Sequence, residues 1–149
     1  MTPLLSVRNL RVTFPTRSGS FDAVRGVSFD LGRERLGVVG ESGSGKSMTG
    51  RAILGLVRPP GRVTADRLDL DGQPILNLPP RQMRKLRGAR ISMVMQDPKF
   101  SLNPVMPIGH QIIEAYRLHT RSNRFDAREK ALEMLRAVQI RDPERVFNA

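Results

Sequence analysis

Apolar and polar residues alternate along the start of the chain with the period of a half-buried β-strand. The alternation covers residues 5–14 and returns over residues 21–31, and both stretches are rich in β-branched and aromatic side chains. Residues 15–20, between them, include the proline and the glycine typical of a turn. Antiparallel β-structure is therefore predicted at the beginning of the chain.

A different pattern follows, in which a short apolar run precedes a glycine-rich loop and an amphipathic helix. Residues 35–39 are typical of a short buried strand. After the loop, apolar residues recur at helical spacing at Met48, Ala52, Ile53 and Leu56. The Pro-Pro-Gly sequence at 59–61 is expected to end this helix.

The remaining pattern predicts a mixture of strands and helices. Residues 67–72 indicate a strand that runs into a turn, residues 81–87 a short helix, residues 91–95 a second buried strand, and residues 108–118 a helix. Asp126 begins a capping-box sequence and is the expected N-cap of a last helix. That helix would present Ala127, Ala131, Leu135 and Val138 on one face, and residues 141–144 would break it.

Residues 40–47 read Gly-Glu-Ser-Gly-Ser-Gly-Lys-Ser, which is the G-x-x-x-x-G-K-S pattern of a phosphate-binding P-loop, or Walker A motif. Its glycines let backbone N–H groups approach phosphate oxygens, and the following helix directs its unpaired N–H groups to the same place. Lys46 adds a cation for the β- and γ-phosphates, and the Ser47 hydroxyl suits Mg²⁺. With a strand before it and a helix after it, the loop indicates nucleotide binding rather than a Ser/Gly-rich turn with an accidental lysine.

Composition changes this picture little. Among the 149 residues, 25 Lys and Arg outnumber 14 Asp and Glu, which gives a formal net charge of +11. Nucleic acid or anionic lipid is compatible with that balance, but the arginines are scattered, and no aromatic residues are interleaved with the one cluster at 81–90. The absence of cysteine excludes disulfides and thiolate metal sites. No apolar run approaches the ~18 residues of a membrane helix, and residues 1–5 show no signal-peptide pattern.

Three stretches make the sequence resemble the ATP-binding subunits of ABC transporters of the oligopeptide and dipeptide (peptide/nickel) import type. They are residues 38–47, the Met-Val-Met-Gln-Asp-Pro sequence at 93–98 and the Phe-Ser-Leu-Asn-Pro sequence that begins at residue 100. The last two are more specific to the peptide branch than the P-loop is. The resemblance covers essentially the whole chain. It implies an α/β P-loop NTPase fold, the ABC nucleotide-binding domain, with an N-terminal antiparallel β subdomain and the start of a helical subdomain.

The resemblance also implies ATP and Mg²⁺ as ligands. The residues expected to bind the nucleotide are Phe14, Gly40, Glu41, Ser42, Gly43, Ser44, Gly45, Lys46, Ser47 and Met48. Lys46 and Gln96 are the expected catalytic residues, and Ser47 and Gln96 the expected metal ligands. Gln96 corresponds to the Q-loop glutamine, whose amide can ligate Mg²⁺ and hydrogen-bond the attacking water.

Other interpretations of these residues stay open. From the residues alone, Gln96 is better explained as a strand-end glutamine satisfied by local backbone. Phe14 corresponds to the aromatic residue that stacks on adenine, but a core position is the alternative, with Phe21 as a competing aromatic. Asp97 follows a mostly apolar run, as a metal-binding acid would, yet Gln96 interrupts that run and the resemblance assigns the site differently.

Several motifs of the family do not occur in these residues: the signature Leu-Ser-Gly-Gly-Gln, an apolar run leading into Asp-Glu, and the switch histidine. The resemblance therefore implies the N-terminal half of one ATP-binding domain, with an incomplete core in which residues 36–39 lack a neighbouring strand. Three parts are expected: an antiparallel β region at 1–34, a P-loop core portion at 35–97, and the beginning of the helical subdomain at 98–149.

The implied partners are transmembrane permease subunits and a second ATP-binding subunit, with no nucleic acid and no membrane span in the chain itself. The implied location is the cytoplasmic face of the inner membrane, where residues 98–114 would face the permease. No residue distinguishes peptide, nickel or another solute as the transported substrate. Two further interpretations stay open: a non-catalytic nucleotide-binding or interaction fragment of a truncated or split gene, and, from charge alone, a P-loop protein acting on nucleic acid.

We predict negligible ATP turnover by the 149-residue chain alone. The sequence holds no Walker B acid and no signature loop, which position the metal ion and the attacking water in this family. Steady-state phosphate release measures the turnover, with the Lys46→Ala chain as the blank. A release rate that Lys46→Ala abolishes would contradict the prediction.

Overall fold

The computed structural model describes residues 3–96 and 101–149. The chain divides into two compact units, Met1–Arg87 and Gly88–Ala149, and each is described by itself. The division into three parts that the sequence predicts, at 1–34, 35–97 and 98–149, is not tested by this division into two units and stays a prediction.

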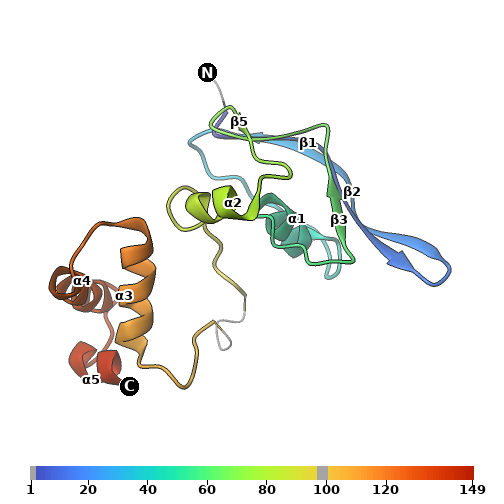
Figure 1. The fold of residues 1–149 in the computed structure, drawn as a ribbon. Coiled ribbons are helices and arrows are strands. Elements are labelled where there is room, and N and C mark those ends of the chain that lie inside the picture. Colours follow the sequence, from blue (N-terminus) through green and yellow to red (C-terminus); the bar gives the residue numbers. More distant parts are fainter. Residues whose placement is uncertain (1–2, 97–100) are drawn as a thin grey trace. The chain divides into compact units, whose positions relative to one another are not determined.

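The first unit is built on an antiparallel sheet. Its strands are β1 (Leu5–Thr16), β2 (Gly19–Leu31), β3 (Arg62–Thr64), β4 (Arg67–Leu70) and β5 (Gln73–Pro74). The strand order is β2-β1-β4-β5, and β3 pairs with β1 further along (Figure 1). The antiparallel β-structure predicted for the start of the chain is therefore confirmed, as a long hairpin of β1 and β2.

The alternation along β1 shifts by one residue in the middle of the strand. Leu5 and Val7 are buried, and after the shift Leu10 and Val12 are buried as well. The register slips between Val7 and Leu10, where Asn9 has a φ of 50°. Such a bulge takes up one extra residue and returns the following side chains to the core face.

Polar contacts join β1 and β2 at the open end of this hairpin, away from the turn that connects the two strands. Arg8 and Ser6 both donate hydrogen bonds to the carboxylate of Asp30 on β2. These hydrogen bonds, that of Arg8 foremost, hold the pKa of Asp30 below its usual range. The first strand is thus fixed to its neighbour by side chains as well as by the backbone ladder.

Helix α1 (Lys46–Ile53) follows the glycine-rich loop, lies against β1 and β2, and buries Thr49, Ala52 and Ile53. It ends before the Pro-Pro-Gly sequence. The N–H of Gly55, at a φ of 61°, donates to the Ala52 carbonyl at 3.0 Å, and the N–H of Leu56 donates to the Arg51 carbonyl at 2.8 Å. This Schellman motif ends the helix. The predictions that residues 59–61 end the helix and that Leu56 continues its apolar face are therefore wrong.

Two stretches predicted as buried strands form no strand in the part of the chain that the structure describes. In residues 35–39, Val38 is 58% and Val39 93% exposed, and in residues 91–95, Val94 is 94% exposed. A strand needs a neighbour for its backbone hydrogen bonds and cover for its side chains. Within the described ranges neither stretch pairs with a neighbouring strand, so both predictions are wrong.

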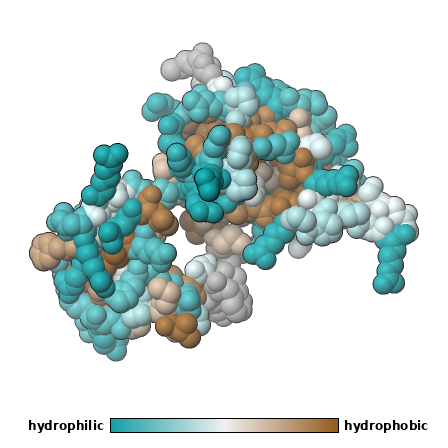
Figure 2. Space-filling model, in the orientation of Figure 1, coloured by the Kyte–Doolittle hydropathy of each residue, from teal (hydrophilic) through white to brown (hydrophobic). Residues whose placement is uncertain are grey.

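Hydrophobic surface is visible among the hydrophilic side chains of the sheet-containing unit (Figure 2).

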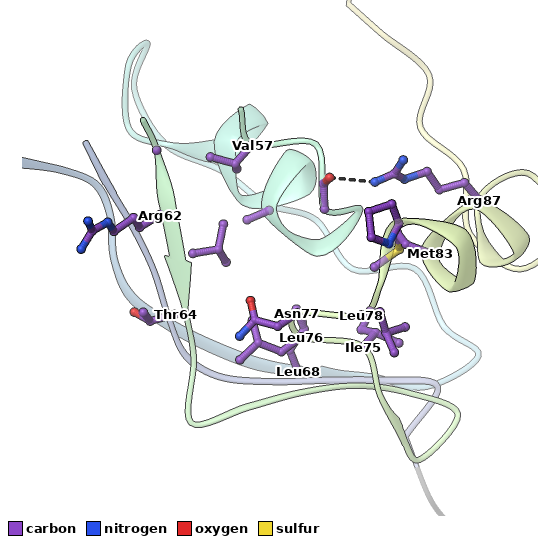
Figure 3. A pocket seen from close by; sticks show the side chains of 15 residues that line it. Val57, Arg62, Thr64, Leu68, Ile75, Leu76, Asn77, Leu78, Met83 and Arg87 are labelled. Atoms are coloured by element: carbon purple, nitrogen blue, oxygen red, sulfur yellow. Dashed lines mark hydrogen bonds between the residues drawn. The ribbon is translucent and has the colours of Figure 1, made fainter. Parts of the chain in front are cut away.

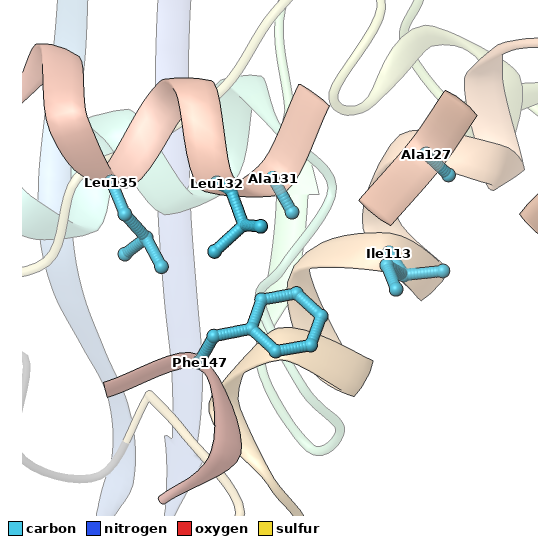
Figure 4. Packing of buried hydrophobic residues seen from close by; sticks show 6 residues of the cluster. All are labelled: Ile113, Ala127, Ala131, Leu132, Leu135 and Phe147. Atoms are coloured by element: carbon cyan, nitrogen blue, oxygen red, sulfur yellow. The ribbon is translucent and has the colours of Figure 1, made fainter. Parts of the chain in front are cut away.

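The second unit contains three helices in its described residues: α3 (Ile108–His119), α4 (Arg124–Ala137) and α5 (Pro143–Asn148). Helix α3 confirms the prediction for residues 108–118. Phe147 of α5 packs among Ile113, Ala127, Ala131, Leu132 and Leu135, which come from α3 and α4 (Figure 4). Hydrophobic burial between the helices therefore contributes to the stability of this unit.

The ends of these helices differ from the predictions. Helix α4 begins at Arg124, because Asn123 is its N-cap and accepts from the Asp126 N–H at 2.9 Å; the expected cap at Asp126 is wrong. Val138 is 68% exposed and does not belong to the buried face. The break at residues 141–144 contains the start of α5, because Asp142 accepts from the Arg145 N–H at 3.2 Å.

No helix in the described ranges combines the length and the apolar composition that crossing a bilayer requires.

Phe147→Ala is expected to lower the free energy of unfolding of the second unit by about 3–5 kcal/mol. The side chain is 5% exposed, and a Cβ on Gly109 would lie 2.4 Å from its ring, so the ring fills the space between α5 and α3. Urea unfolding followed by helical circular dichroism measures the loss. Phe125→Ala, at a 71% exposed phenylalanine of α4, is the matched control and should change stability by no more than about 0.5 kcal/mol. Equal losses for the two substitutions would contradict the prediction.

Candidate phosphate-binding site

The glycine-rich loop lies close to the sheet at Gly45. This residue is the N-cap of α1 and has a φ of 91°. A Cβ there would lie 2.4 Å from the carbonyl oxygen of Ala23 in β2. The left-handed backbone and the close approach both require glycine. The sequence thereby fixes the start of α1 against the sheet.

Helix α1 begins without a side-chain cap in the described structure. Gly45 has no side chain to offer, and the first turn holds no acidic residue. The first bond within the helix is that of the Thr49 N–H to the Gly45 carbonyl, at 2.8 Å. The N–H groups before it carry the partial positive charge of a helix N-terminus. An anion such as phosphate is the complementary ligand.

The side chain of Lys46 folds back over the loop. Its Nζ donates to the carbonyl oxygens of Gly40 and Glu41, both at 2.7 Å, and lies 3.3 Å from Ser44 Oγ. All three acceptors belong to the loop itself, so the ammonium group is held where the loop closes. A phosphate oxygen is charged and is therefore a stronger acceptor than these neutral oxygens.

The hydroxyl groups around Lys46 have different environments. Ser47, the next residue of α1, is exposed, and Met48 is half-buried. Thr49 is buried, and its Oγ1 donates to the Gly45 carbonyl at 3.0 Å. In this turn Ser47 is therefore open to solvent, whereas the hydroxyl of Thr49 is bonded within the fold. The assignment of Ser47 as a metal ligand stays a prediction.

The outer part of the loop is a turn on the surface. Glu41, Ser42, Gly43 and Ser44 are all exposed, and the Ser44 N–H donates to the Glu41 carbonyl at 3.2 Å. Gly40, Ser44 and Lys46 also border a pocket of about 460 Å³, whose other lining residues are 27–29 of β2, 36–39 and Thr49. The loop is thus accessible to solvent at residues 41–44 and from this pocket.

A larger pocket of about 680 Å³ in the same unit includes none of residues 40–47 (Figure 3).

Arg87, at the margin of this pocket, follows helix α2 (Pro80–Leu86), the helix predicted at 81–87. Its Nε donates to the Leu54 carbonyl and its Nη2 to the Gly55 carbonyl, each at 2.7 Å. Arg87 therefore satisfies carbonyls at the end of α1. Sequence reasoning missed this role, because Arg87 was one member of a basic cluster.

The two aromatic candidates for adenine stacking are opposite each other in the β1–β2 ladder. Phe14 is half-buried, and Phe21 is 53% exposed. Phe14 Cε1 lies 2.6 Å from the position that a Cβ on Gly61 would take, so its ring packs closely on that glycine. The structure brings the two rings to one end of the hairpin, and the assignment of stacking to Phe14 stays a prediction.

Gln96 belongs to the second unit, where it is exposed and lies in a bend. Because residues 91–95 form no strand, it is not the strand-end glutamine considered above. Its proximity to Ser47 stays a prediction. Asp97 lies outside the described residues.

Comparison with known proteins gives consistent matches. Residues 24–148 match the protein family described as ABC transporter. The oligopeptide transport ATP-binding protein OppD of Escherichia coli (strain K12) is 46% identical over 138 residues, which cover 92% of this chain and 41% of that protein. The dipeptide transport ATP-binding protein DppD of Bacillus subtilis (strain 168) is 45% identical over 145 residues, which cover 96% and 43%.

A third relative is the probable peptide ABC transporter ATP-binding protein y4tR of Sinorhizobium fredii (strain NBRC 101917 / NGR234). It is 46% identical over 147 residues, which cover 97% of this chain and 44% of that protein. The chain thus spans about two fifths of the length of the curated relatives that it matches.

Proposed function

The chain belongs to the ABC transporter family, and from that premise we propose that it is the ATP-binding portion of a subunit whose ATP hydrolysis drives the import of peptides across a membrane. The family implies nucleotide binding. Peptides as the cargo are supported by the names of the similar proteins, which are ATP-binding proteins of oligopeptide and dipeptide transport. The activity of the whole subunit is part of the proposal, because the chain spans only part of these relatives.

The geometry of residues 40–47 is the observation that carries the proposal. Gly45 fixes the uncapped start of α1 against the sheet, and Lys46 lies across the loop. Backbone N–H groups from Glu41 to Ser47 would surround the phosphates, and Lys46 would neutralise the charge that develops between the β- and γ-phosphates. Met48, in the first turn of α1, is the last residue of the proposed nucleotide-binding set.

The proposed metal ligands fit Mg²⁺ in their chemistry. Ser47 offers a hydroxyl oxygen that is exposed in the first turn of α1, and Gln96 an exposed amide oxygen. Both are hard, neutral ligands of the kind that Mg²⁺ accepts beside phosphate oxygens and water. When bound, the metal ion would neutralise phosphate charge. Gln96 would in addition orient the attacking water through its amide group.

The proposed partners are transmembrane permease subunits and a second ATP-binding subunit, at the cytoplasmic face of the inner membrane. Residues 98–114 would face the permease. In the described part of that segment Leu102, Val105 and Met106 are 47%, 84% and 38% exposed. Apolar side chains that stand in solvent are the kind that a partner surface covers.

Lys46→Ala should weaken the binding of Mg-ATP by at least about 100-fold, because it removes a cation that makes charge-assisted hydrogen bonds with phosphate. Titration calorimetry on the 149-residue chain measures the affinity. Lys85→Ala, at an exposed lysine of α2, is the matched control and should leave the affinity unchanged. An unchanged affinity in Lys46→Ala would overturn the assignment of the loop.

Phe14→Leu should weaken ATP binding by roughly tenfold, because leucine preserves much of the packing but has no π-face to stack on adenine. The affinity for inorganic triphosphate should not change, since that ligand has no base. Phe21→Leu is the control on the opposite strand. If Phe21→Leu weakens ATP binding and Phe14→Leu does not, the stacking role of Phe14 is wrong.

A further inference from the structure

One side chain, that of Gln111 in α3, holds the loop that leads into this helix. Gln111 Oε1 accepts from the Asn103 N–H at 2.9 Å. Its Nε2 donates to the carbonyl oxygens of Asn103 and Met106, at 2.9 and 2.8 Å. A primary amide has one acceptor oxygen and two N–H donors, and all of them are used here. Gln111 therefore bonds the backbone of Asn103 as a peptide group of a neighbouring strand would.

The loop also carries bonds of its own, centred on Asn103. Asn103 Oδ1 accepts from the Val105 N–H at 3.1 Å, and the Met106 N–H donates to the Asn103 carbonyl at 3.2 Å. Pro104 and Pro107 restrict φ at two further positions. The result is a tight turn at residues 103–106, which is closed by one backbone bond and one bond to the Asn103 side chain and is fastened to α3 by Gln111.

Burial does not order this turn. Residues 101–107 are all exposed, and Val105 is 84% exposed. The helix that supplies Gln111 is itself anchored, since the Ile108 N–H donates to the Ala149 carbonyl at 2.9 Å and Gly109 lies against the Phe147 ring. The hydrogen bonds of Gln111 therefore connect the turn to a helix that is itself packed in the helical unit.

We infer that Gln111 is a positioning residue, which fixes the turn at residues 103–106 in the shape that presents Leu102, Val105 and Met106 to the partner. The identity of that partner, a transmembrane subunit, rests on the proposed function. A turn that is ordered before the partner arrives loses less conformational entropy on binding, and so binds more tightly for the same contacts. The role of Gln111 is separate from the phosphate loop at residues 40–47, which belongs to the other unit.

Backbone amide exchange on the full 149-residue chain, measured by NMR, tests the positioning role. In Gln111→Ala the Asn103 amide should exchange about three- to tenfold faster, the range expected for the loss of one such hydrogen bond. Gln111→Glu keeps an acceptor for the Asn103 N–H, so that amide should stay protected. The substitution removes both donors to the carbonyls of Asn103 and Met106, so the turn should loosen. The amides of Val105 and Met106, which are bonded within the turn, should then exchange faster. His110→Ala, at the exposed neighbour of Gln111, is the control and should match the unmodified chain.

Equal exchange at Asn103 in Gln111→Ala and in the unmodified chain would overturn the inference. The urea midpoint and the affinity for Mg-ATP should stay unchanged in Gln111→Ala, because alanine favours the helix and the substitution lies outside the phosphate loop. A large fall in the urea midpoint would show that Gln111 supports the whole unit rather than the turn, and would also count against the inference.

Binding to inside-out vesicles of the source cell's inner membrane tests the partner. Gln111→Ala should lower the fraction of chain bound several-fold, as Val105→Asp should, while His110→Ala should not. Normal vesicle binding by Gln111→Ala would overturn the inference. If the unmodified chain binds ATP but not the vesicles, the proposed partner is wrong, whereas the exchange data still decide the role of Gln111 in the turn.

Discussion

The packing of α1 on β1 and β2 is the interaction on which the phosphate site depends. The helix buries Thr49, Ala52 and Ile53 against the sheet, and its two ends are treated differently. The end near Gly45 has no side-chain cap and faces the loop. The other end is closed by the Gly55 turn and by the guanidinium of Arg87. The partial positive charge of the uncapped N-terminus favours an anion, and the sheet and the closed end fix where that N-terminus lies.

In each unit one long polar side chain forms hydrogen bonds with backbone groups outside regular helices and strands. Arg87 bonds the carbonyls at the end of α1, and Gln111 bonds both backbone groups of Asn103. Each supplies a partner to backbone groups that no regular helix or strand would satisfy. The role of Arg87 also bears on the net charge of +11, because one of the basic residues that suggested nucleic acid is engaged in the fold.

The sequence predicts best those features whose chemical requirements are local. The loop at residues 40–47 can be identified because its glycines and Lys46 are needed within a few residues of one another, and the family match agrees with that interpretation. The β1–β2 hairpin follows from alternation. The apolar runs at 35–39 and 91–95 were misread, because such a run shows that side chains need cover and does not show which neighbour provides it.

Helix ends and single-residue roles were less predictable for a related reason. Asn123 and Asp126 both have N-cap chemistry, and only the fold selects Asn123. Asp142 followed by proline looks like a break, although the same pair also starts a helix, as it does at α5. The amide of Gln111 finds its partners across a turn whose shape no periodicity reveals.

Gly43 and Gly45 stand two positions apart in the same motif, yet they differ in mutational tolerance. Both have left-handed backbone, with φ of 80° and 91°. A Cβ on Gly43 meets nothing within 4 Å, whereas a Cβ on Gly45 meets the Ala23 carbonyl. Position 43 therefore admits a residue that tolerates this backbone, such as asparagine, at a modest cost. Position 45 is closed to every side chain unless β2 moves away, so natural variation in this loop should enter through its outer turn.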